Sequence, residues 1–381
     1  MKMKARFSRG GLNSLLASLV SILAGLLFGL ILLVIFNPAR AGNGFMSILL
    51  TGVRSSARFA KVLYTAAPLL MTGLSVGFAF KTGLFNIGAS GQFTMGAFFS
   101  LMGAIIWQLP WPLCLLLSVI GGALWGAIPG LCKALFNVNE VITSIMFNWI
   151  GLFTVNLLTY NNPIMLASAW GDVSKDRTAN LAKANLDAIL PKLGMDKLMK
   201  FNGMNIAIFI AVIAALIIWF ILQKTTFGYE LKACGYNRHA SRYAGINSGR
   251  KIVQSMIIAG ALAGLGGGLY YLTGTVQLTL GKELSAMGFN GIPVAMLAAS
   301  HPIGTIFSAL FISYIQVGGD SMQPEFAREM IDIIIASIIY LSAFSLLIRE
   351  LIGRAKWHSV LTLKPGEKAP GGAESGGGEN L

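Results

Sequence analysis

Two amide side chains, Asn86 and Gln92, stand within the apolar, glycine-rich stretch KTGLFNIGASGQFTMGAF, residues 81–98. An amide donates and accepts hydrogen bonds without carrying a charge, so such a pair can bind a neutral polar molecule that brings no counter-ion. Glycine loosens the helix around them, and unwound backbone at membrane depth is tolerated where it is buried in protein or lines a wet path. The stretch is therefore a candidate part of a solute pathway. Hydrogen bonding between helices is the alternative role for the two amides.

A second stretch, GFNGIP at residues 288–293, repeats the Phe-Asn pair among glycines that occurs in GLFNIG at residues 83–88. Interrupted helices at corresponding positions of two halves of a chain point to a transport site. A further amide, Asn148, could extend a polar stripe, and its neighbour Trp149 is either an interface anchor or a stacking partner for a base. The predicted pathway residues are Asn86, Gln92, Asn148 and Asn290, with the aromatic Phe85 and Trp149.

Membrane-spanning helices are the elements that must position these residues. The chain has 381 residues, of which 55% are hydrophobic and only 12% are charged, whereas soluble domains carry about 25% charged residues. Continuous apolar runs of roughly the 20 residues needed to cross a bilayer favour helices over a barrel. They recur near residues 14–36, 59–80, 84–107, 112–132, 140–160, 204–222, 251–272, 284–300, 302–319 and 329–348. We expect an all-α, polytopic membrane protein with about ten transmembrane helices, inverted-repeat character, and short or broken helices near the midplane.

The placement of Lys and Arg predicts the orientation. With ten spans both termini share a side, and more than half of the 29 Lys and Arg residues fall on that side, which indicates cytoplasmic termini. We expect a cytoplasmic N-terminal tail over 1–13, a membrane domain over 14–348, and a Gly-rich, disordered cytoplasmic tail over 349–381. Within the membrane domain, 161–203 is expected to be an external loop and 224–251 a cytoplasmic loop. The stretch NLAKANLDAILPKL in the external loop has its apolar residues near one helical face, which predicts either a helix on the outer membrane surface or a docking platform for an external partner.

The predicted cytoplasmic loop holds a short helical stretch, NRHASRYAG, bracketed by Gly235 and Gly245. A short helix held between two spans can act as a lever, because a push on it moves both attached helices. The polarity of the loop alone would fit an ordinary connection, so its helical content is the informative feature.

Four stretches resemble one family of membrane proteins. GYELKACGYNRHASRYAGI (228–246) strongly resembles the cytoplasmic coupling loop of ATP-binding-cassette (ABC) importer permeases of the branched-chain amino acid and simple-sugar superfamily, and GLFNIGASGQFTMGAF resembles that superfamily's FNIGxxGQ core. NVNEVITSIMFNWI (137–150) and GFNGIPVAMLAASHPIG (288–304) resemble its nucleoside-type branch. Ser90 replaces an acidic residue common in that core, and 296–304 lacks a basic residue often found there, which leaves the exact substrate open.

The resemblance implies the longer permease subunit of an ABC importer, in the cell (inner or cytoplasmic) membrane, coupled to separate ABC ATPase subunits through the 230–246 loop. It implies as partners a second permease subunit, expected to be a shorter paralogue, and an extracytoplasmic substrate-binding lipoprotein or protein. The solute is then a nucleoside or a related sugar-like compound; a simple sugar or another small solute is the alternative. The residues implied in the ATPase contact are Gly235, Asn237, Arg238, Ala240, Arg242, Tyr243 and Gly245.

Other chemistries lack the residues that they need. No G-x-x-x-x-G-K-[ST] loop occurs, and GLGGGLY (264–270) lacks the lysine, so close helix packing explains it better than phosphate binding. The three His and three Cys are scattered, so we expect no catalytic residue, metal or cofactor. The net charge of +14 fits basic loops facing anionic lipid without any nucleic acid.

Two other functions fit the sequence less well. An ion-coupled transporter would need carboxylates in the spans, which offer little beyond Glu140 and Asp332. A non-transporting scaffold would leave the coupling loop without a role.

Overall fold

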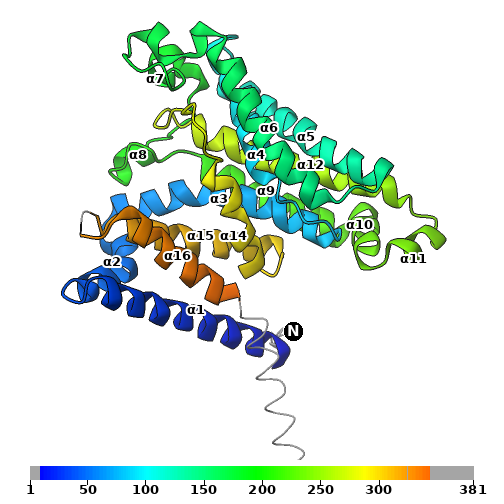
Figure 1. Ribbon diagram of the computed structural model, residues 1–381, viewed down its shortest axis with the longest axis horizontal. Helices are drawn as coiled ribbons and strands as arrows, with labels where there is room; N and C mark the ends of the chain where they lie inside the picture. Colours follow the sequence, from blue (N-terminus) through cyan, green and yellow to red (C-terminus); the bar gives the residue numbers. More distant parts are fainter. Residues whose placement is uncertain (1–8, 324, 344–381) are drawn as a thin grey trace, which may run out of the picture.

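The computed structural model describes residues 9–323 and 325–343, and these residues fold almost entirely into helices (Figure 1). In this part of the chain the only strand-like pairings are two isolated β-bridges, Leu166–Thr178 and Arg177–Thr279. Six helices in it are long and apolar enough to cross a membrane: α3 (Ser56–Lys81), α5 (Trp111–Phe136), α6 (Glu140–Tyr160), α9 (Ala207–Lys224), α12 (Ser248–Tyr271) and α15 (Pro302–Asp320). The prediction of an all-α polytopic membrane protein is confirmed.

Four further apolar segments lie outside this set of six. Three are single helices, namely α1 (Arg9–Phe36), α4 (Ala89–Ile105) and α16 (Arg328–Ala343). The fourth, predicted over 284–300, is interrupted at Asn290 and forms the short helices α13 (Ala286–Phe289) and α14 (Gly291–Leu297). The broken helix was expected, whereas the total of ten spans stays a prediction. The predicted 349–381 tail lies outside the described residues.

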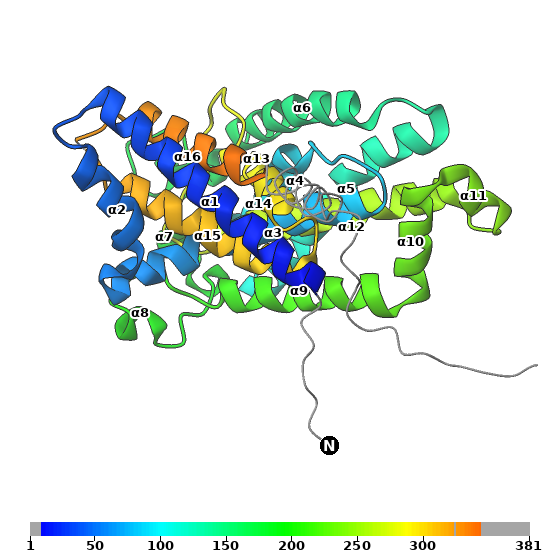
Figure 2. The same cartoon turned by 90° about the horizontal axis from the view of Figure 1, so that it is seen from below.

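Apart from α13 and α14, which lie within the bundle, the shorter helices lie at two opposite ends of the molecule. Figures 1 and 2 show α2 (Ala41–Arg54), α7 (Leu181–Ala184) and α8 (Met195–Leu198) at one end, which we call the α2 end. At the other, the α10 end, lie α10 (Thr226–Tyr236) and α11 (Arg238–Tyr243). Three 3-10 turns complete the set: η1 (Pro163–Met165), η2 (Ala167–Trp170) and η3 (Leu186–Ala188).

Helices α3, α4 and α12 form the interior, and others expose apolar faces. The apolar windows of α3 and α12 are 83% and 67% buried, against 33% for α6 and for α9. The outward face of α6 carries Met146 and Phe153, each more than half exposed, and α9 exposes Phe209 in the same way. An apolar face of this kind requires lipid or another subunit to cover it.

Close backbone contact joins α12 to α4 and α5 through a set of glycines that we call the glycine seam: Gly96, Gly122, Gly260 and Gly264. A Cβ added to Gly264 would lie 2.4 Å from the Ser118 carbonyl oxygen, and one added to Gly96 would lie 2.3 Å from the Gly264 Cα. No side chain fits at these distances, so glycine is required. The prediction that GLGGGLY serves helix packing is confirmed.

The segment 161–203 folds back over the α2 end without the surface helix predicted over NLAKANLDAILPKL. That prediction is wrong: the stretch forms only α7 and η3, and Leu186 is 70% exposed. Asn185 ends α7, because its Oδ1 accepts from the backbone N–H groups of Asp187 and Ala188 while its Nδ2 donates to the carbonyls of Ala104 and Leu109. Satisfying those two carbonyls at the end of α4 outweighs the local helical pattern.

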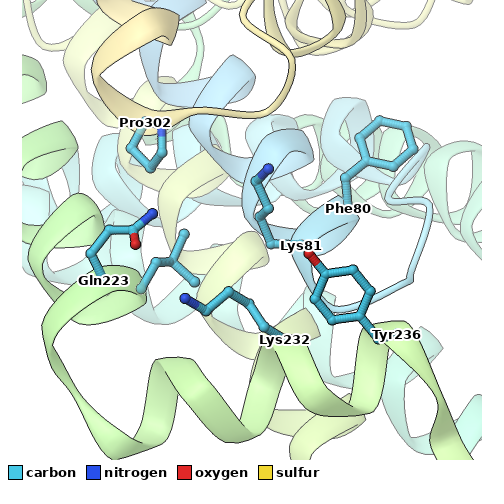
Figure 3. A pocket seen from close by; sticks show the side chains of 8 residues that line it. Phe80, Lys81, Gln223, Lys232, Tyr236 and Pro302 are labelled. Atoms are coloured by element: carbon cyan, nitrogen blue, oxygen red, sulfur yellow. The ribbon is translucent and has the colours of Figure 1, made fainter. Parts of the chain in front are cut away.

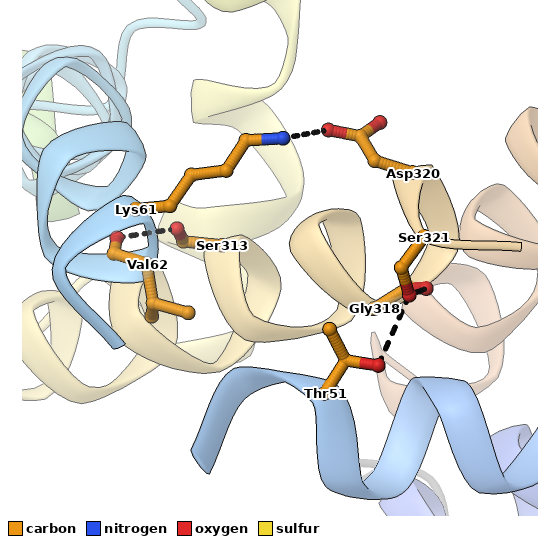
Figure 4. Close-up of polar contacts among 7 residues, drawn as sticks. All are labelled: Thr51, Lys61, Val62, Ser313, Gly318, Asp320 and Ser321. Atoms are coloured by element: carbon orange, nitrogen blue, oxygen red, sulfur yellow. Dashed lines mark hydrogen bonds and ion pairs between the residues drawn. The ribbon is translucent and has the colours of Figure 1, made fainter. Parts of the chain in front are cut away.

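Polar contacts fasten α2 and α3 to the end of α15 (Figure 4). Lys61 pairs with Asp320 at 2.9 Å, Ser313 donates to the Val62 carbonyl at 2.6 Å, and Ser321 donates to Thr51 at 3.0 Å. Each of these contacts joins residues more than 250 positions apart. Residues 51–62 and 313–321, which are far apart in the sequence, are thereby held together at the α2 end.

Candidate functional site

The chain between α3 and α4 makes a tight turn at residues 82–88 in place of a continuous helix. Gly83 has φ +71°, a left-handed conformation that disfavours any residue with a Cβ. The Leu84 N–H still reaches back to the Ala79 carbonyl, 3.1 Å away, before the chain leaves the helix. Predicted pathway residues Phe85 and Asn86 therefore lie in a true helix break.

Asn86 and Gln92 form a reciprocal amide pair across this break. Asn86 Nδ2 donates to Gln92 Oε1 at 2.8 Å, and Gln92 Nε2 donates back to Asn86 Oδ1 at 3.1 Å. Asn86 Nδ2 also donates to Ser75 Oγ on α3, at 3.0 Å. Both amides are at most 1% exposed, so a polar contact missing here would leave a buried group unsatisfied.

Asn148 ties α6 to the same break. Its Oδ1 accepts from the Gly91 N–H at 2.8 Å, and its Nδ2 donates to the Ile87 carbonyl at 3.1 Å. These are backbone groups that the interrupted helix leaves without helical partners. We name Ser75, Asn86, Gln92 and Asn148 the amide cluster.

The second Phe-Asn segment, GFNGIP (288–293), packs against α3 and the start of α4, on either side of the first helix break. A Cβ added to Gly288 would lie 2.2 Å from the Ser90 Cα, and one added to Gly291 would lie 2.6 Å from the Thr72 carbonyl carbon. Asn290 stands between these contacts, joins α13 to α14 and is partly exposed. Among the described residues its side chain makes no capping hydrogen bond.

The two aromatic candidates lie apart from the buried amides. Phe85 is partly exposed and stacks on Phe80, with ring centroids 4.9 Å apart. Trp149 is 42% exposed, stacks on Phe153, and faces away from its buried neighbour Asn148. The structure thus gathers Asn86, Gln92 and Asn148, places the Asn290 segment beside them, and directs Trp149 outward.

Three serines lie around the break; the sequence analysis did not single out Ser75 and Ser144, and it noted Ser90 only as a departure from the family pattern. Ser75 accepts from Asn86, and Ser144 Oγ is fully buried without a hydrogen-bond partner among the described residues. Ser90 Oγ donates to the Ser285 carbonyl at 3.0 Å, a bond that an ionised acidic side chain at that position could not make. Single serines in apolar helices carry little signal, although Ser90 was conspicuous as a departure from the family pattern.

The 224–251 segment contains α10, α11 and the start of α12. Asn237 caps α11, with its Oδ1 accepting from the His239 and Ala240 N–H groups at 3.0 Å, and Gly245 follows the helix with φ +79°. Tyr243 is 95% exposed, so α11 presents side chains outward. Arg238 is partly exposed, whereas Ala240 and Arg242 are exposed.

Gly235 is a contact point inside α10 and not a bracket in front of the short helix. A Cβ added there would lie 2.7 Å from the Lys81 carbonyl oxygen and 2.9 Å from the Gly83 nitrogen. Backbone of α10 therefore touches the turn that leads to Asn86, three residues beyond Gly83. The segment formed by α10 and α11, which we call the lever segment, is therefore in direct contact with the helix break at residues 82–88.

The carboxylates at the α10 end are paired. Glu140, the first residue of α6, forms an ion pair with Lys133 at 2.9 Å, and Glu230 pairs with Lys251 at 2.5 Å. A carboxylate at a helix N-terminus also complements the helix dipole. The arrangement of Glu140 is that of a helix-terminal ion pair.

Comparisons with known proteins identify the family. Residues 58–343 match the family described as "Branched-chain amino acid transport system / permease component". The chain belongs to this family. The resemblance predicted from the four motifs is confirmed, and the chain is a multi-pass membrane protein of the permease class.

Two relatives match nearly end to end. The guanosine ABC transporter permease protein NupP of Bacillus subtilis is 34% identical, over 91% of this chain and 97% of its own length. The nucleoside ABC transporter permease protein NupB of Lactococcus lactis is 36% identical, over 94% and 99%. The glucose ABC transporter permease protein TsgB13 of Haloferax volcanii is 28% identical over 84% of both chains. No solved structure matches this chain.

Proposed function

We propose that this chain is the non-catalytic membrane subunit of an ATP-driven importer that carries nucleosides. The main support for this proposal is the backbone contact between Gly235 on α10 and the Gly83 turn. This contact links a helix at the surface mechanically to the buried amide cluster. The similarity to NupP and NupB supports the nucleoside as passenger.

The link suggests how a surface event opens a path. A displacement of α10 moves Gly235 against the backbone of residues 81–83 and so shifts Asn86 relative to Gln92. Breaking the amide pair frees two donors and two acceptors, which a nucleoside's hydroxyl groups and base edge can replace. In the described conformation the pair is closed, so solute binding at Asn86, Gln92 and Asn148 requires this rearrangement, while Asn290 is already partly exposed.

The proposal includes partners and an orientation. ABC ATPase subunits bind the exposed α11 surface around Arg242 and Tyr243, which puts the α10 end and both termini in the cytoplasm. The α2 end, with the 161–203 loop, faces outward toward a substrate-binding lipoprotein. A second, shorter permease covers part of the exposed apolar surface of the bundle. Specificity resides mainly in the receptor.

A second candidate is import of a simple sugar, which the similarity to TsgB13 favours. The same neutral amides suit sugar hydroxyl groups. The higher identity and fuller coverage of the two nucleoside relatives make the nucleoside the better-supported passenger. Coupling to an ion is less well supported, because Glu140 is held by Lys133 at the end of its helix.

The test is uptake in vesicles that contain the full complex. We expect ATP-driven accumulation of guanosine and not of glucose, and we expect Tyr243→Ala to lower it at least about tenfold, as loss of a central interface contact does. Val173→Ala, at an equally exposed position of the α2 end, is the matched control and should keep full uptake. Unchanged uptake and ATPase activity in Tyr243→Ala would refute coupling through α11; uptake of glucose alone would move the passenger to the sugar class.

A further inference from the structure

The α10 end contains a cavity of about 450 Å³ that the proposed pathway does not use (Figure 3). The ends of three helices and the start of a fourth line this open cavity, which lies where α3, α9, α10 and α15 meet. Its lining residues are Phe80, Lys81, Leu222, Gln223, Lys232, Gly235, Tyr236 and Pro302.

Two ammonium groups give this cavity its charge. Lys81 enters from α3 and Lys232 from α10, and both side chains are only partly exposed. Lys81 Nζ donates one hydrogen bond, to the Ala299 carbonyl at 3.3 Å, and keeps two N–H donors. Among the described residues neither lysine pairs with a carboxylate, since Glu140 and Glu230 are taken by other lysines.

His301, next to the lining residue Pro302, does not add a third charge at neutral pH. Its Nδ1 accepts from the Gly304 N–H at 3.4 Å, which caps α15 and requires the unprotonated nitrogen. Burial, followed by the nearby Lys81 ammonium, lowers the pKa of His301 below its ordinary value. The charge of the cavity therefore comes from the two lysines.

We propose that this cavity binds the phosphate group of a larger molecule. Two lysines without carboxylate partners match a phosphate, for which ammonium groups are common protein ligands. The volume exceeds that of inorganic phosphate and falls in the range of small-molecule sites. The Gln223 amide, the Tyr236 hydroxyl and the rings of Phe80 and Tyr236 can contact the remainder, whether it is a soluble phosphate ester or a lipid.

The position of the site predicts its effect. A phosphate held between Lys81 and Lys232 joins α3 to α10 beside the Gly83–Gly235 contact. An occupied site therefore fastens the lever segment to the helix break. Binding at this site does not depend on the proposed passenger, because it involves only side chains of this chain at its α10 end.

Binding to the full-length purified chain tests the proposal without ATPase or receptor. The probes are inorganic phosphate, guanosine 5′-monophosphate, and nanodiscs of phosphatidylglycerol; guanosine and phosphatidylcholine are their uncharged or zwitterionic counterparts. Lys232→Gln, on the surface helix α10, and Lys81→Gln should each weaken binding of the phosphate probe at least tenfold. Lys224→Gln removes an exposed charge at the same end, outside the lining, and should change binding less than twofold.

The outcomes separate the two sources of phosphate. Lysine-dependent binding of guanosine 5′-monophosphate, but not of guanosine, supports a soluble ester; lysine-dependent retention of phosphatidylglycerol supports a lipid. The proposal is overturned if all three probes bind wild type and Lys232→Gln equally, or if none binds wild type. A separate co-purification of the chain with its ATPase subunits gives one more test: if Lys232→Gln impairs that assembly while probe binding stays as in wild type, the cavity belongs to a subunit contact and the proposal is overturned.

Discussion

The two segments with a Phe-Asn pair among glycines, GLFNIG (83–88) and GFNGIP (288–293), look alike in sequence and differ in how they are held in the fold. At 83–88 the helix break is closed by side chains, and Asn86 has every one of its polar contacts inside the amide cluster. At 288–293 the break is closed by backbone packing of Gly288 and Gly291 on neighbouring helices, and the Asn290 side chain is left without a capping role. One break is thus held by hydrogen bonds and the other by shape.

This difference separates stability from binding. A side chain whose hydrogen-bonding groups are all paired is costly to remove, whereas one that lacks such bonds can be exchanged with little effect on folding and remains available to a ligand. Asn290 is therefore the better candidate for direct solute contact in the described conformation, and Asn86 the better candidate for holding the closed state.

The largest expected effect is on the first break. Asn86→Leu leaves the Gln92 amide buried and unpaired, which should lower the free energy of unfolding by about 2–3 kcal/mol. Asn290→Leu is the matched change at the second break and should cost under about 0.5 kcal/mol. Thermal unfolding of the purified chain measures both, and the double variant Asn86→Leu/Gln92→Leu should cost less than the sum of its single changes. Equal losses at the two asparagines would break the comparison.

The second break should respond instead to added volume. Gly288→Ala places a Cβ 2.2 Å from the Ser90 Cα, so the α13–α4 contact must open, at about 1–3 kcal/mol. Gly281→Ala, whose nearest neighbouring atom would lie 4.0 Å away, is the control and should be neutral. The same thermal midpoints report the result; a tolerated Gly288→Ala would show that shape does not close this break.

Two serines near the first break should shift stability in opposite directions. Ser75→Ala removes an acceptor of Asn86 and should cost about 1 kcal/mol, whereas Ser144→Ala removes a buried hydroxyl without a partner and should be neutral or stabilising by about 0.5 kcal/mol. Chemical unfolding in detergent compares the pair. A loss in Ser144→Ala as large as in Ser75→Ala would mean that Ser144 has a partner in solution.

The smallest expected effect is a pH dependence of the free energy of unfolding, caused by His301, which caps α15 after the second break. The folded-state pKa of His301 is lowered by partial burial of its ring and by the nearby Lys81 ammonium, so the unfolded chain binds the proton more readily as the pH falls. Stability should therefore decrease below about pH 6.5, by roughly 0.5 kcal/mol, since protonation removes the Nδ1 acceptor that caps α15 at an exposed position. His301→Asn keeps a capping side chain that does not titrate, so this variant should not lose stability below about pH 6.5. If its pH profile of stability is the same as that of wild type, His301 is not the cause of the decrease.

The sequence predicted correctly those parts of the fold that depend on apolar composition or on glycine. The apolar runs located the long helices, and GLGGGLY gave close packing because nothing but glycine fits there. The surface helix predicted over 180–193 was wrong because Asn185 donates hydrogen bonds to the carbonyls of Ala104 and Leu109, which are far away in the sequence. Asn86 and Gln92 could be singled out as unusual, but their mutual pairing could not, since it depends on how the chain turns at Gly83. Whether these amides, Phe85 and Trp149 touch the solute, and whether the 235–245 residues touch an ATPase, stay predictions.

The glycine seam also determines which parts of the bundle can bend. Helices that touch backbone to backbone have no side-chain rotamers between them to rearrange, so α4, α5 and α12 should turn as one solid body. A displacement of α10 then cannot be absorbed by bending these helices, so the backbone change is concentrated in the Gly83 turn. Because the helices beside the Gly83 turn cannot deform, a movement of α10 is passed to that turn with little loss.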